Sequence, residues 1–412
     1  MASTKKNILY LAISQGSNYL LPLLIYPVII RAIGINAFGK VTFAIVIMQM
    51  FFLIIDFGFG YSATKHVALN YRNKVFLSHY FAKITAARFL FFTGTVVILF
   101  IGLLVPPLNE IRNLLFIAMI AVFFNIINPN WFLQGLGMMK IMAINSLISR
   151  GISIVLIYLS IKWINNIYYI IVVLVFPYIY YSFASFLFVL KKGYIVLYKP
   201  KIHEVLDVIK DSAYFFFSTL ATSAYTMLTP IILGSISGTV SLGIFNSANL
   251  IKQGFAGLIS PIIQAFYPKV NVVYKEEPSN ARRLVYKLLL CIVFLFSLAS
   301  LPFVLFSSEI ASLLFGNKAG DILETLRLMS FLPLLIAINS IVGLLILVPE
   351  GENKKYFNVI ISGGIVCLLS VYPLCFYYGA SGAAISLIIA EIVVFLGMIK
   401  YLIKGSVWTK RK

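Results

Sequence analysis

The sequence predicts an all-α membrane protein with about twelve transmembrane helices in two six-helix bundles. Three observations support this fold class. Hydrophobic residues make up 61% of the 412 residues and charged residues only 11%, whereas soluble domains are about 45–50% apolar and about 25% charged. The apolar residues fall into runs of about 20, the length of a spanning helix. The two halves of the chain also resemble each other weakly.

The predicted spans follow one another with short connections. We expect them at residues 8–30, 41–64, 80–104, 113–134, 141–161, 167–190, 212–234, 243–267, 284–306, 326–348, 357–378 and 380–403. Only Gly379-Ala380-Ser381-Gly382 separates the last two, so the number falls to eleven if this segment is not a turn. Lys5 and Lys6 precede the first run, but no small-residue cleavage pattern follows it, so we expect a retained helix and no cleaved signal peptide.

The net charge of +20 would suggest a nucleic-acid partner in a soluble protein. In a membrane protein, basic residues instead mark the cytoplasmic loops. Twelve spans with the N-terminus inside place 24 of the 33 Lys and Arg residues in cytoplasmic segments and 6 in outer loops. We therefore predict cytoplasmic N- and C-termini and no nucleic-acid partner. Eleven spans would move the C-terminal tail outside.

The longest polar connection lies near the middle of the chain. We predict an N-terminal bundle at 1–190, a cytoplasmic linker at 191–211, a C-terminal bundle at 212–403 and a basic cytoplasmic tail at 404–412. Residues 10–92 and 214–296 share 13 identities in 83 positions at a shift of 204 residues, against about seven expected from composition. A six-span repeat keeps both copies in the same orientation, as in transporters that rock two bundles around a central site.

Signatures of an enzyme or a metalloprotein are missing from the sequence. Three cysteines and three histidines form neither a CxxC pair nor a cluster with acids, so we expect no metal and no cofactor. Neither a Walker A loop nor a G-x-S-x-G or H-E-x-x-H motif is present. No predicted loop exceeds about 20 residues, which leaves no room for a soluble catalytic domain. Energy for transport would come from an ion gradient, the membrane potential or the substrate gradient.

Two basic residues deep in predicted spans are candidates for a cationic substrate cleft, because intramembrane charge is costly. Arg150 lies near the middle of the fifth span, among polar residues at positions 145, 146, 149 and 153 that share adjacent helical faces. A structural hydrogen-bond site between helices is the alternative for Arg150. Lys252 lies about nine residues into the eighth span, too deep to reach the interface easily.

Three further charges lie inside predicted spans. Arg88, the third basic candidate for the cleft, and Asp56 are each about 10–12 Å from the cytoplasmic end of their spans. They could form a structural ion pair, which is the simpler interpretation. Glu391 lies near the middle of the last span. It could couple transport to protons or cations, or be an acid that burial keeps neutral. Asp56 is the second candidate for coupling.

Polar residues four apart recur in the first and seventh spans. Ser14 and Asn18 in the first span correspond to Ser218 and Thr222 in the seventh at the same shift of 204 residues. Residues four apart share one face of a helix. This pattern favours two polar walls of one cleft, although hydroxyls that bond to their own backbone would give the same pattern.

Several motifs resemble those of bacterial Wzx-type (RfbX-like) O-antigen flippases. The most specific is YLAISQGSNYLLPLLIYP at 10–27, followed by Arg31-Ala32-Ile33-Gly34 and Ala37-Phe38-Gly39. Supporting motifs along the chain are NPNWFLQG at 128–135, GIFNSAN at 243–249, QAFYP at 264–268 and Gly382-Ala383-Ala384 with Glu391. These flippases form the polysaccharide transporter branch of the multidrug/oligosaccharidyl-lipid/polysaccharide exporter superfamily.

This resemblance implies a protein of the bacterial inner membrane with a V-shaped pair of six-helix bundles and a central, cationic cleft. It also implies a substrate, an undecaprenyl-pyrophosphate-linked oligosaccharide repeat unit that moves from the cytoplasmic to the periplasmic leaflet by alternating access. The O-antigen polymerase and the chain-length regulator are possible partners. A drug/cation antiporter of the same superfamily is the main alternative, but Asp56 and Glu391 are too few acids beside three intramembrane bases. A polymerase or ligase would need a long periplasmic loop.

Overall fold

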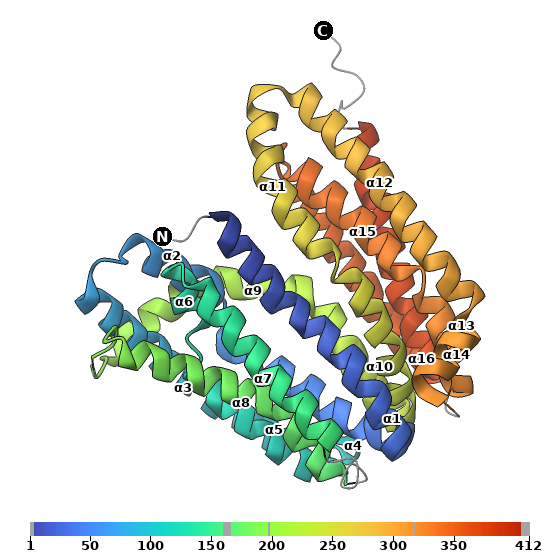
Figure 1. Ribbon diagram of the computed structural model, residues 1–412, viewed down its shortest axis with the longest axis horizontal. Helices are drawn as coiled ribbons and strands as arrows, with labels where there is room; N and C mark the ends of the chain where they lie inside the picture. The colour runs from blue at the N-terminus through green and yellow to red at the C-terminus, as the bar shows by residue number, and fades with distance from the viewer. Residues whose placement is uncertain (1–3, 160–165, 197, 317–318, 405–412) are drawn as a thin grey trace. The chain divides into compact units, whose positions relative to one another are not determined.

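The computed structural model describes residues 4–159, 166–196, 198–316 and 319–404, and it contains helices and short connections but no strand in these ranges (Figure 1). The chain divides into two compact units. Unit 1 comprises Met1–Ile25 and Asn36–Ser223, and unit 2 comprises Tyr26–Ile35 and Ala224–Lys412. The division therefore lies inside a helix after Ser223, beyond the polar segment at 191–211.

The first nine helices run through unit 1 and into the start of unit 2. They are α1 (Thr4–Asp56), α2 (Phe59–Leu69), α3 (Lys74–Gly102), α4 (Pro106–Asn109), α5 (Arg112–Asn125), α6 (Asn130–Gly135), α7 (Met139–Leu159), α8 (Ile167–Lys191) and α9 (Ile202–Ile236). The remaining elements belong to unit 2. They are α10 (Gly238–Ala256), α11 (Ile259–Glu276), α12 (Pro278–Leu305), α13 (Ser307–Phe315), α14 (Ala319–Met329), α15 (Leu332–Val342), a π-helical turn (Gly343–Leu347) and α16 (Asn353–Lys404).

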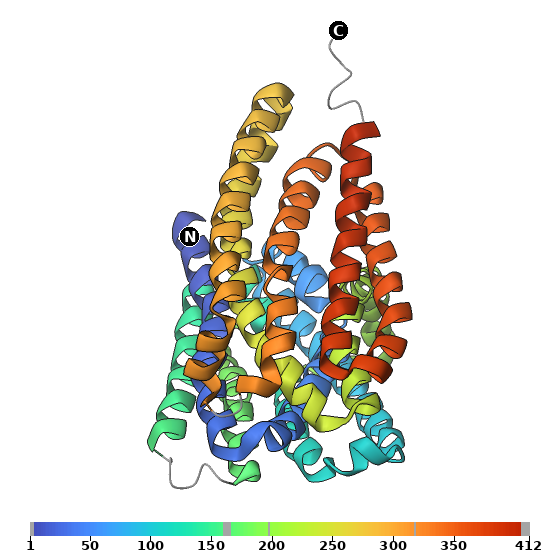
Figure 2. The ribbon, with the colours of Figure 1, turned by 90° about the vertical axis from the view of Figure 1, so that its right-hand side faces the viewer.

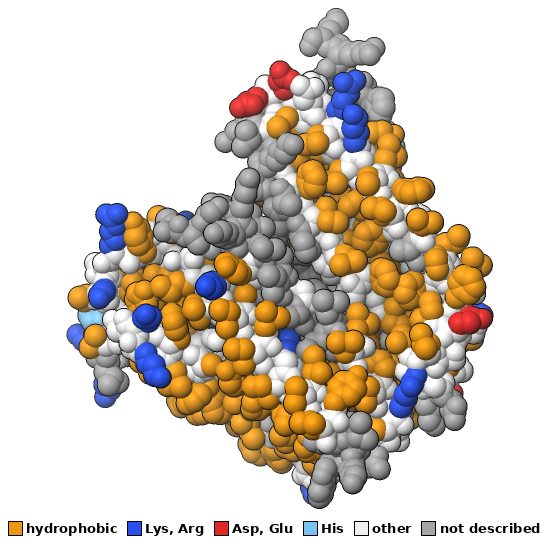
Figure 3. Space-filling model, in the orientation of Figure 1, with side chains coloured by type: hydrophobic (Ala, Val, Ile, Leu, Met, Phe, Trp, Pro, Cys, Tyr) orange, Lys and Arg blue, Asp and Glu red, His pale blue; other side chains and the backbone are white. Residues whose placement is uncertain are grey.

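The membrane character of the fold is confirmed. Eight helical segments within the described ranges are long and apolar enough to cross a membrane, and one of them, Lys354–Tyr401, has 48 residues, enough for two crossings. Over unit 1, hydrophobic side chains cover the surface along α3, α5 and α8, and Lys and Arg side chains gather at the end where α2 and the start of α3 lie (Figure 3). This distribution is typical of a surface that faces lipid between two charged interfaces.

Two glycines with positive φ break the longest helices. Gly34 (φ 78°) interrupts α1, and Gly379 (φ 53°) interrupts α16, in backbone conformations that other residues rarely adopt. After Gly379 the chain reverses, and Gly363 and Gly397 in the two halves of α16 lie against side chains of the opposite half (Figure 2). The segment around Gly379 is therefore a turn, as twelve spans require.

Two predicted cytoplasmic segments, 65–79 and 191–211, meet the end of the predicted span at 113–134 at one end of unit 1. Trp131 of α6 is buried in one hydrophobic cluster with Val67 of α2, Leu77 of α3 and Val205 of α9. The hydroxyl of Thr64 donates to the backbone carbonyl of Trp131 at 3.1 Å. These segments are far apart in the sequence, so their association supports the prediction that they share one side of the membrane.

The polar segment at 191–211 is partly helical and is attached to α3. Its second half is the beginning of α9, which starts at Ile202. The Ser78 hydroxyl donates to the Val196 carbonyl at 2.6 Å, and the Val196 amide donates to Ser78 Oγ at 2.7 Å. The Lys83 ammonium lies 2.8 Å from a Glu204 carboxylate oxygen. The segment therefore folds onto unit 1.

Residues 26–35 of α1 pack within unit 2, although α1 begins in unit 1. Arg31 donates from Nε to the Leu314 carbonyl at 2.9 Å, and from Nη2 to the Leu313 carbonyl. Both carbonyls lie at the C-terminal end of α13, where backbone acceptors lack helical partners and an arginine satisfies them.

Candidate functional site

The candidate charges form three separate clusters in the described part of the chain. Two of them lie in unit 1 and one lies in unit 2.

The first cluster of unit 1 forms where α5 ends and α6 begins. Arg88 of α3 donates from Nη2 to Asp56 Oδ1 at 2.8 Å and from Nη1 to the Asn128 carbonyl at 2.6 Å. The Nη1 group also lies 3.3 Å from the Asn125 carbonyl. Arg88 thus binds two carbonyls at the break between α5 and α6, of which the Asn125 carbonyl also accepts from the Asn128 amide at 3.2 Å.

The exposure of this pair differs between its members. The Arg88 side chain is 4% exposed, whereas the Asp56 side chain is 46% exposed. Asn125 Nδ2 adds a second donor to Asp56 Oδ1 at 3.3 Å. The ion pair predicted from the sequence is therefore present, and the buried Arg88 acts as a structural link between α1, α3 and the α5–α6 break. Asp56 keeps an accessible side that a proton or cation could reach.

The second cluster in unit 1 surrounds Arg150 on α7. Arg150 Nη1 donates to Ser146 Oγ at 2.8 Å, and two tyrosines of α8, Tyr178 and Tyr181, are close enough to interact with the guanidinium electrostatically. The Tyr181 hydroxyl in turn bonds to Asn130 Oδ1 of α6. Arg150 is therefore partly buried at a site lined with hydroxyl and amide groups, which suits recognition of phosphate or sugar oxygens.

The polar stripe around Arg150 faces protein, as predicted. Asn145 Nδ2 donates to Ser185 Oγ of α8 at 2.9 Å. The Ser153 hydroxyl donates to the Val173 carbonyl of α8 at 3.0 Å. These two bonds join α7 to α8, so Asn145 and Ser153 have the structural interhelical role that was the alternative interpretation of the stripe.

The cluster in unit 2 is centred on Glu391 of α16. Asn339 of α15 donates from Nδ2 to Glu391 Oε2 at 2.7 Å and to the Glu391 carbonyl at 3.0 Å. The Tyr225 hydroxyl of α9 lies 3.5 Å from Glu391 Oε1. Lys252 of α10 is a cationic neighbour that interacts with Glu391 electrostatically. Three helices thus direct polar groups at one carboxyl group inside unit 2.

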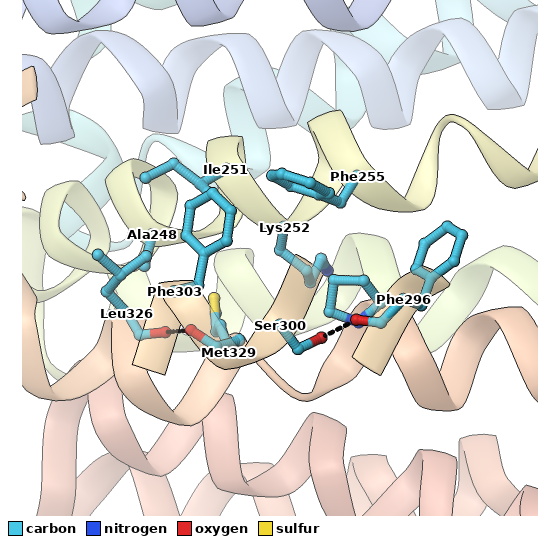
Figure 4. Close-up of a pocket in the computed structure, with 11 residues that line it drawn as sticks. Ala248, Ile251, Lys252, Phe255, Phe296, Ser300, Phe303, Leu326 and Met329 are labelled. Carbon is cyan, nitrogen blue, oxygen red and sulfur yellow. Dashed lines mark hydrogen bonds between the residues drawn. The ribbon is translucent and has the colours of Figure 1, made fainter. Parts of the chain in front are cut away.

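Lys252 borders a small cavity in unit 2. From α10 its side chain extends toward Phe296 and Ser300 of α12 (Figure 4). The cavity has a volume of about 20 Å³, enough for about one water molecule. The Ser300 hydroxyl donates to the Phe296 carbonyl at 2.7 Å, so it is already engaged. The cavity walls are otherwise mainly apolar, and a polar guest would be drawn to the ammonium group.

The proposed polar walls of a cleft lie outside the part of the chain whose side chains are described. Ser14, Asn18, Ser218 and Thr222 belong to α1 and α9 as helical backbone. The structure therefore leaves their role as a prediction.

Several polar residues of these clusters were not predicted from the sequence. Tyr181, Asn339 and Tyr225 contact candidate charges, yet each lies in a different helix from the charge that it contacts, so the sequence does not pair them. The one available signal was the presence of an amide or hydroxyl in a spanning helix, where such groups seek a partner.

Comparison with known proteins identifies the family. Residues 4–270, more than half of the chain, match the model of the family described as "Polysaccharide biosynthesis protein". The chain belongs to this family.

Relatives of this family member extend the match over nearly the full length. A protein of Escherichia coli (strain K12) named "Putative O-antigen transporter" is 29% identical over 95% of both chains. A Shigella dysenteriae protein of the same name is 27% identical over 96% of this chain and 99% of its own. The predicted resemblance to Wzx-type flippases is thereby confirmed.

Solved structures show the same fold. An inward-facing multidrug resistance MATE family transporter of the MOP superfamily matches with a TM-score of 0.74 and 15% identity, over 92% of this chain and 93% of the other. The lipid II flippase MurJ, in an inward closed conformation, matches with a TM-score of 0.75 and 16% identity, over 95% of this chain and 87% of the other. The all-α polytopic transporter fold is therefore confirmed.

Proposed function

We propose that this protein is a flippase that moves an undecaprenyl-pyrophosphate-linked O-antigen repeat unit, or a similar surface polysaccharide unit, from the cytoplasmic to the periplasmic leaflet. The observation that carries the proposal is the similarity over 95% of both chains to a relative named as an O-antigen transporter. The basic residues inside the membrane are consistent with it, because a pyrophosphate cannot cross hydrocarbon without compensating charge.

The two units would contribute different chemistry to this substrate. Arg150, with its tyrosine and serine neighbours, provides a cation beside hydroxyl groups, and such an arrangement can bind phosphate and sugar oxygens together. Lys252 provides a second cation beside a small cavity. Arg88 is held by Asp56 and by two backbone carbonyls. In this proposal it is therefore a structural ion-pair partner that does not bind the substrate directly.

Glu391 is the residue that we propose for energy coupling. Its carboxyl group accepts hydrogen bonds from an amide and lies near Tyr225 and Lys252. Uptake of a proton would remove its attraction for the lysine and weaken its contact with Asn339, because a neutral acid is a poorer acceptor. Protonation could therefore change how strongly α10, α15 and α16 are held together. Asp56, whose side chain is about half exposed, is the second candidate for energy coupling.

The decisive experiment is deletion of the gene followed by analysis of lipid-linked intermediates in membranes. We expect single repeat units linked to the polyprenyl carrier to accumulate on the cytoplasmic side, and surface polysaccharide to disappear. Expression of the intact protein should reverse both effects. Multi-repeat products on the periplasmic side of the deletion strain would contradict the proposal, because polymerisation would then proceed without this protein. Loss of the carrier-linked repeat unit itself would indicate an enzyme of its synthesis instead.

A further inference from the structure

An apolar groove of about 620 Å³ opens on the surface of unit 1. Its walls come from α3, the end of α5, the end of α8 and Ile195, Val196 and Tyr198 of the polar segment. Phe89 and Phe123 on its walls are each more than half exposed. This volume lies within the range of about 300–1,000 Å³ typical of small-molecule sites.

The walls of the groove suit a hydrocarbon chain. Two hydroxyl groups belong to them, and both are engaged within the protein: Thr85 donates to the Phe81 carbonyl at 2.9 Å, and Tyr198 donates to Glu204 Oε2 at 2.8 Å. The other lining residues are aliphatic or aromatic. An alkyl chain in the groove would therefore leave neither hydroxyl without a partner, and it would contact the rings of the walls.

Hydrogen bonds, a ring stack and an ion pair hold the end of the groove beside the polar segment in place. Val196 is joined to Ser78 by two hydrogen bonds, and the Tyr198 ring stacks on His79 at a centroid distance of 3.8 Å. Glu204 holds the same region to Lys83. The Lys83 ammonium and the donors on Lys201 and Tyr198 lower the pKa of the Glu204 carboxyl to about 2, so this carboxylate is charged at neutral pH.

Positive charge surrounds that end of the groove. Residues 191–201 contain four lysines and no acid, and all four lysines are exposed: Lys191, Lys192, Lys199 and Lys201. Leu190 and Tyr198, which line the groove, are sequence neighbours of three of them. Glu204, the first acid that follows, already pairs with Lys83. The segment is predicted to be cytoplasmic, where the leaflet carries anionic lipids.

We propose that this groove and its lysines bind an anionic glycerophospholipid of the cytoplasmic leaflet. One acyl chain would lie in the groove, and the phosphate group would lie among Lys191, Lys192 and Lys199. The charge complementarity favours an anionic over a zwitterionic lipid. The groove opens on the outer surface of membrane-spanning helices, which phospholipids surround. The site is independent of the proposed flippase activity and would join the polar segment to the bilayer.

The test compares two lipids with identical acyl chains on the purified full-length protein. Native mass spectrometry should show phosphatidylglycerol retained about a hundredfold more strongly than phosphatidylethanolamine, since each of the three lysines near the anionic head group contributes about 1 kcal/mol and about 1.4 kcal/mol corresponds to a factor of ten. A triple substitution of Lys191, Lys192 and Lys199 to Gln should abolish the preference. Ala86→Trp should fill the groove and weaken retention of both lipids. Thr93→Trp, at an exposed position two turns further along α3, is the matched control and should leave retention unchanged.

A fluorescence measurement on the unmodified groove provides a second test. Trp131 stacks on Phe81, a groove residue, at a centroid distance of 5.5 Å. The variant for this test has Trp163 and Trp408 replaced by Phe and keeps Ala86, so Trp131 is its one tryptophan. Phosphatidylglycerol with brominated acyl chains should quench the fluorescence of Trp131. Equal retention of the two lipids, or the absence of quenching, would overturn the proposal. Displacement of phosphatidylglycerol by an equal concentration of a polyprenyl phosphate would also overturn it, because the groove would then belong to the carrier.

Discussion

Arg88 in unit 1 and Lys252 in unit 2 are both basic residues inside the membrane, but their surroundings differ. Arg88 has a carboxylate and two backbone carbonyls within hydrogen-bond distance. Lys252 has an acid, Glu391, as an electrostatic neighbour and borders a cavity. Both Nη groups of Arg88 are directed at fixed protein groups, and its Nε is buried without a hydrogen-bond partner, so no donor of Arg88 is left for a ligand. Lys252 borders a cavity large enough for about one water molecule, which a polar group of a ligand could enter. Burial alone would not have separated these two roles.

Removal of Arg88 should have the largest effect. Arg88→Ala removes the cation that pairs with Asp56 and a donor to two carbonyls, and Asn125 remains as a weaker donor to Asp56. Loss of one member of a fully buried pair costs about 3–5 kcal/mol, and the exposed side of Asp56 lowers this cost. We expect low amounts of protein in the membrane and a lowered unfolding temperature in detergent. The double variant Arg88→Met with Asp56→Asn should be less unstable than the single one, since it removes the unpaired charge. A normal amount of Arg88→Ala protein with no flipping would show that Arg88 serves transport instead.

Substitution of Lys252 should reduce function and spare the fold. A hydrogen bond to a charged group contributes about 1.5–3 kcal/mol, so Lys252→Ala should lower the rate of flipping about tenfold or more. Surface polysaccharide should fall while the amount of membrane protein stays constant. Lys252→Arg keeps the charge and should restore most of the polysaccharide. An unstable Lys252→Ala protein would place Lys252 with Arg88 as a structural charge.

Arg150 should behave between these two extremes. Arg150→Ala removes a bond to Ser146 and the attraction to Tyr178 and Tyr181, groups that can still bind sugar oxygens in its absence. We expect surface polysaccharide to fall moderately and the protein level to remain normal. The double variant with Lys252→Ala should fall further than either single variant. Normal polysaccharide in that double variant would exclude a cationic binding site built from these residues.

The smallest effect is expected at Glu204, outside the membrane-spanning helices. Its carboxyl pKa is lowered to about 2 by Lys83, Lys201 and Tyr198. A lowered pKa stabilises the folded state at pH values above the ordinary pKa of the acid, and this stabilisation is lost as the pH falls toward the lowered value. Glu204→Gln should therefore lower the unfolding temperature slightly at pH 7, and the difference from the unmodified protein should shrink below about pH 4.5. A difference that is constant with pH would indicate a packing effect instead.

Much of the fold could be predicted from the sequence, because each observation used was local. The apolar runs predicted the helices, and the Gly-Ala-Ser-Gly segment predicted the turn at Gly379. The positive φ of Gly379 explains why a glycine begins this turn. The pairing of Asp56 with Arg88 could be anticipated from their equal depth in the membrane. Depth follows from the rise per residue, which is the same in every helix.

The composition of the polar clusters could not be predicted in this way. Contacts such as Arg150 with Tyr181, or Glu391 with Asn339, depend on how each helix is rotated about its own axis relative to its neighbours. In a chain with 61% hydrophobic residues, apolar periodicity barely distinguishes a lipid-facing side from a buried one. The attachment of Val196 to Ser78 could not be predicted for a related reason, since the Ser78 hydroxyl bonds to the backbone of Val196 and any residue type offers the same backbone groups.

The path of α1 has a consequence for dissecting the gene. Because Tyr26–Ile35 belongs to unit 2 while the rest of α1 belongs to unit 1, the chain passes between the units after residues 25, 35 and 223. A cut in the polar segment would leave the second fragment without the residues that cap α13 through Arg31. The two fragments should therefore fold only when they are produced together, like the pieces of a split reporter protein.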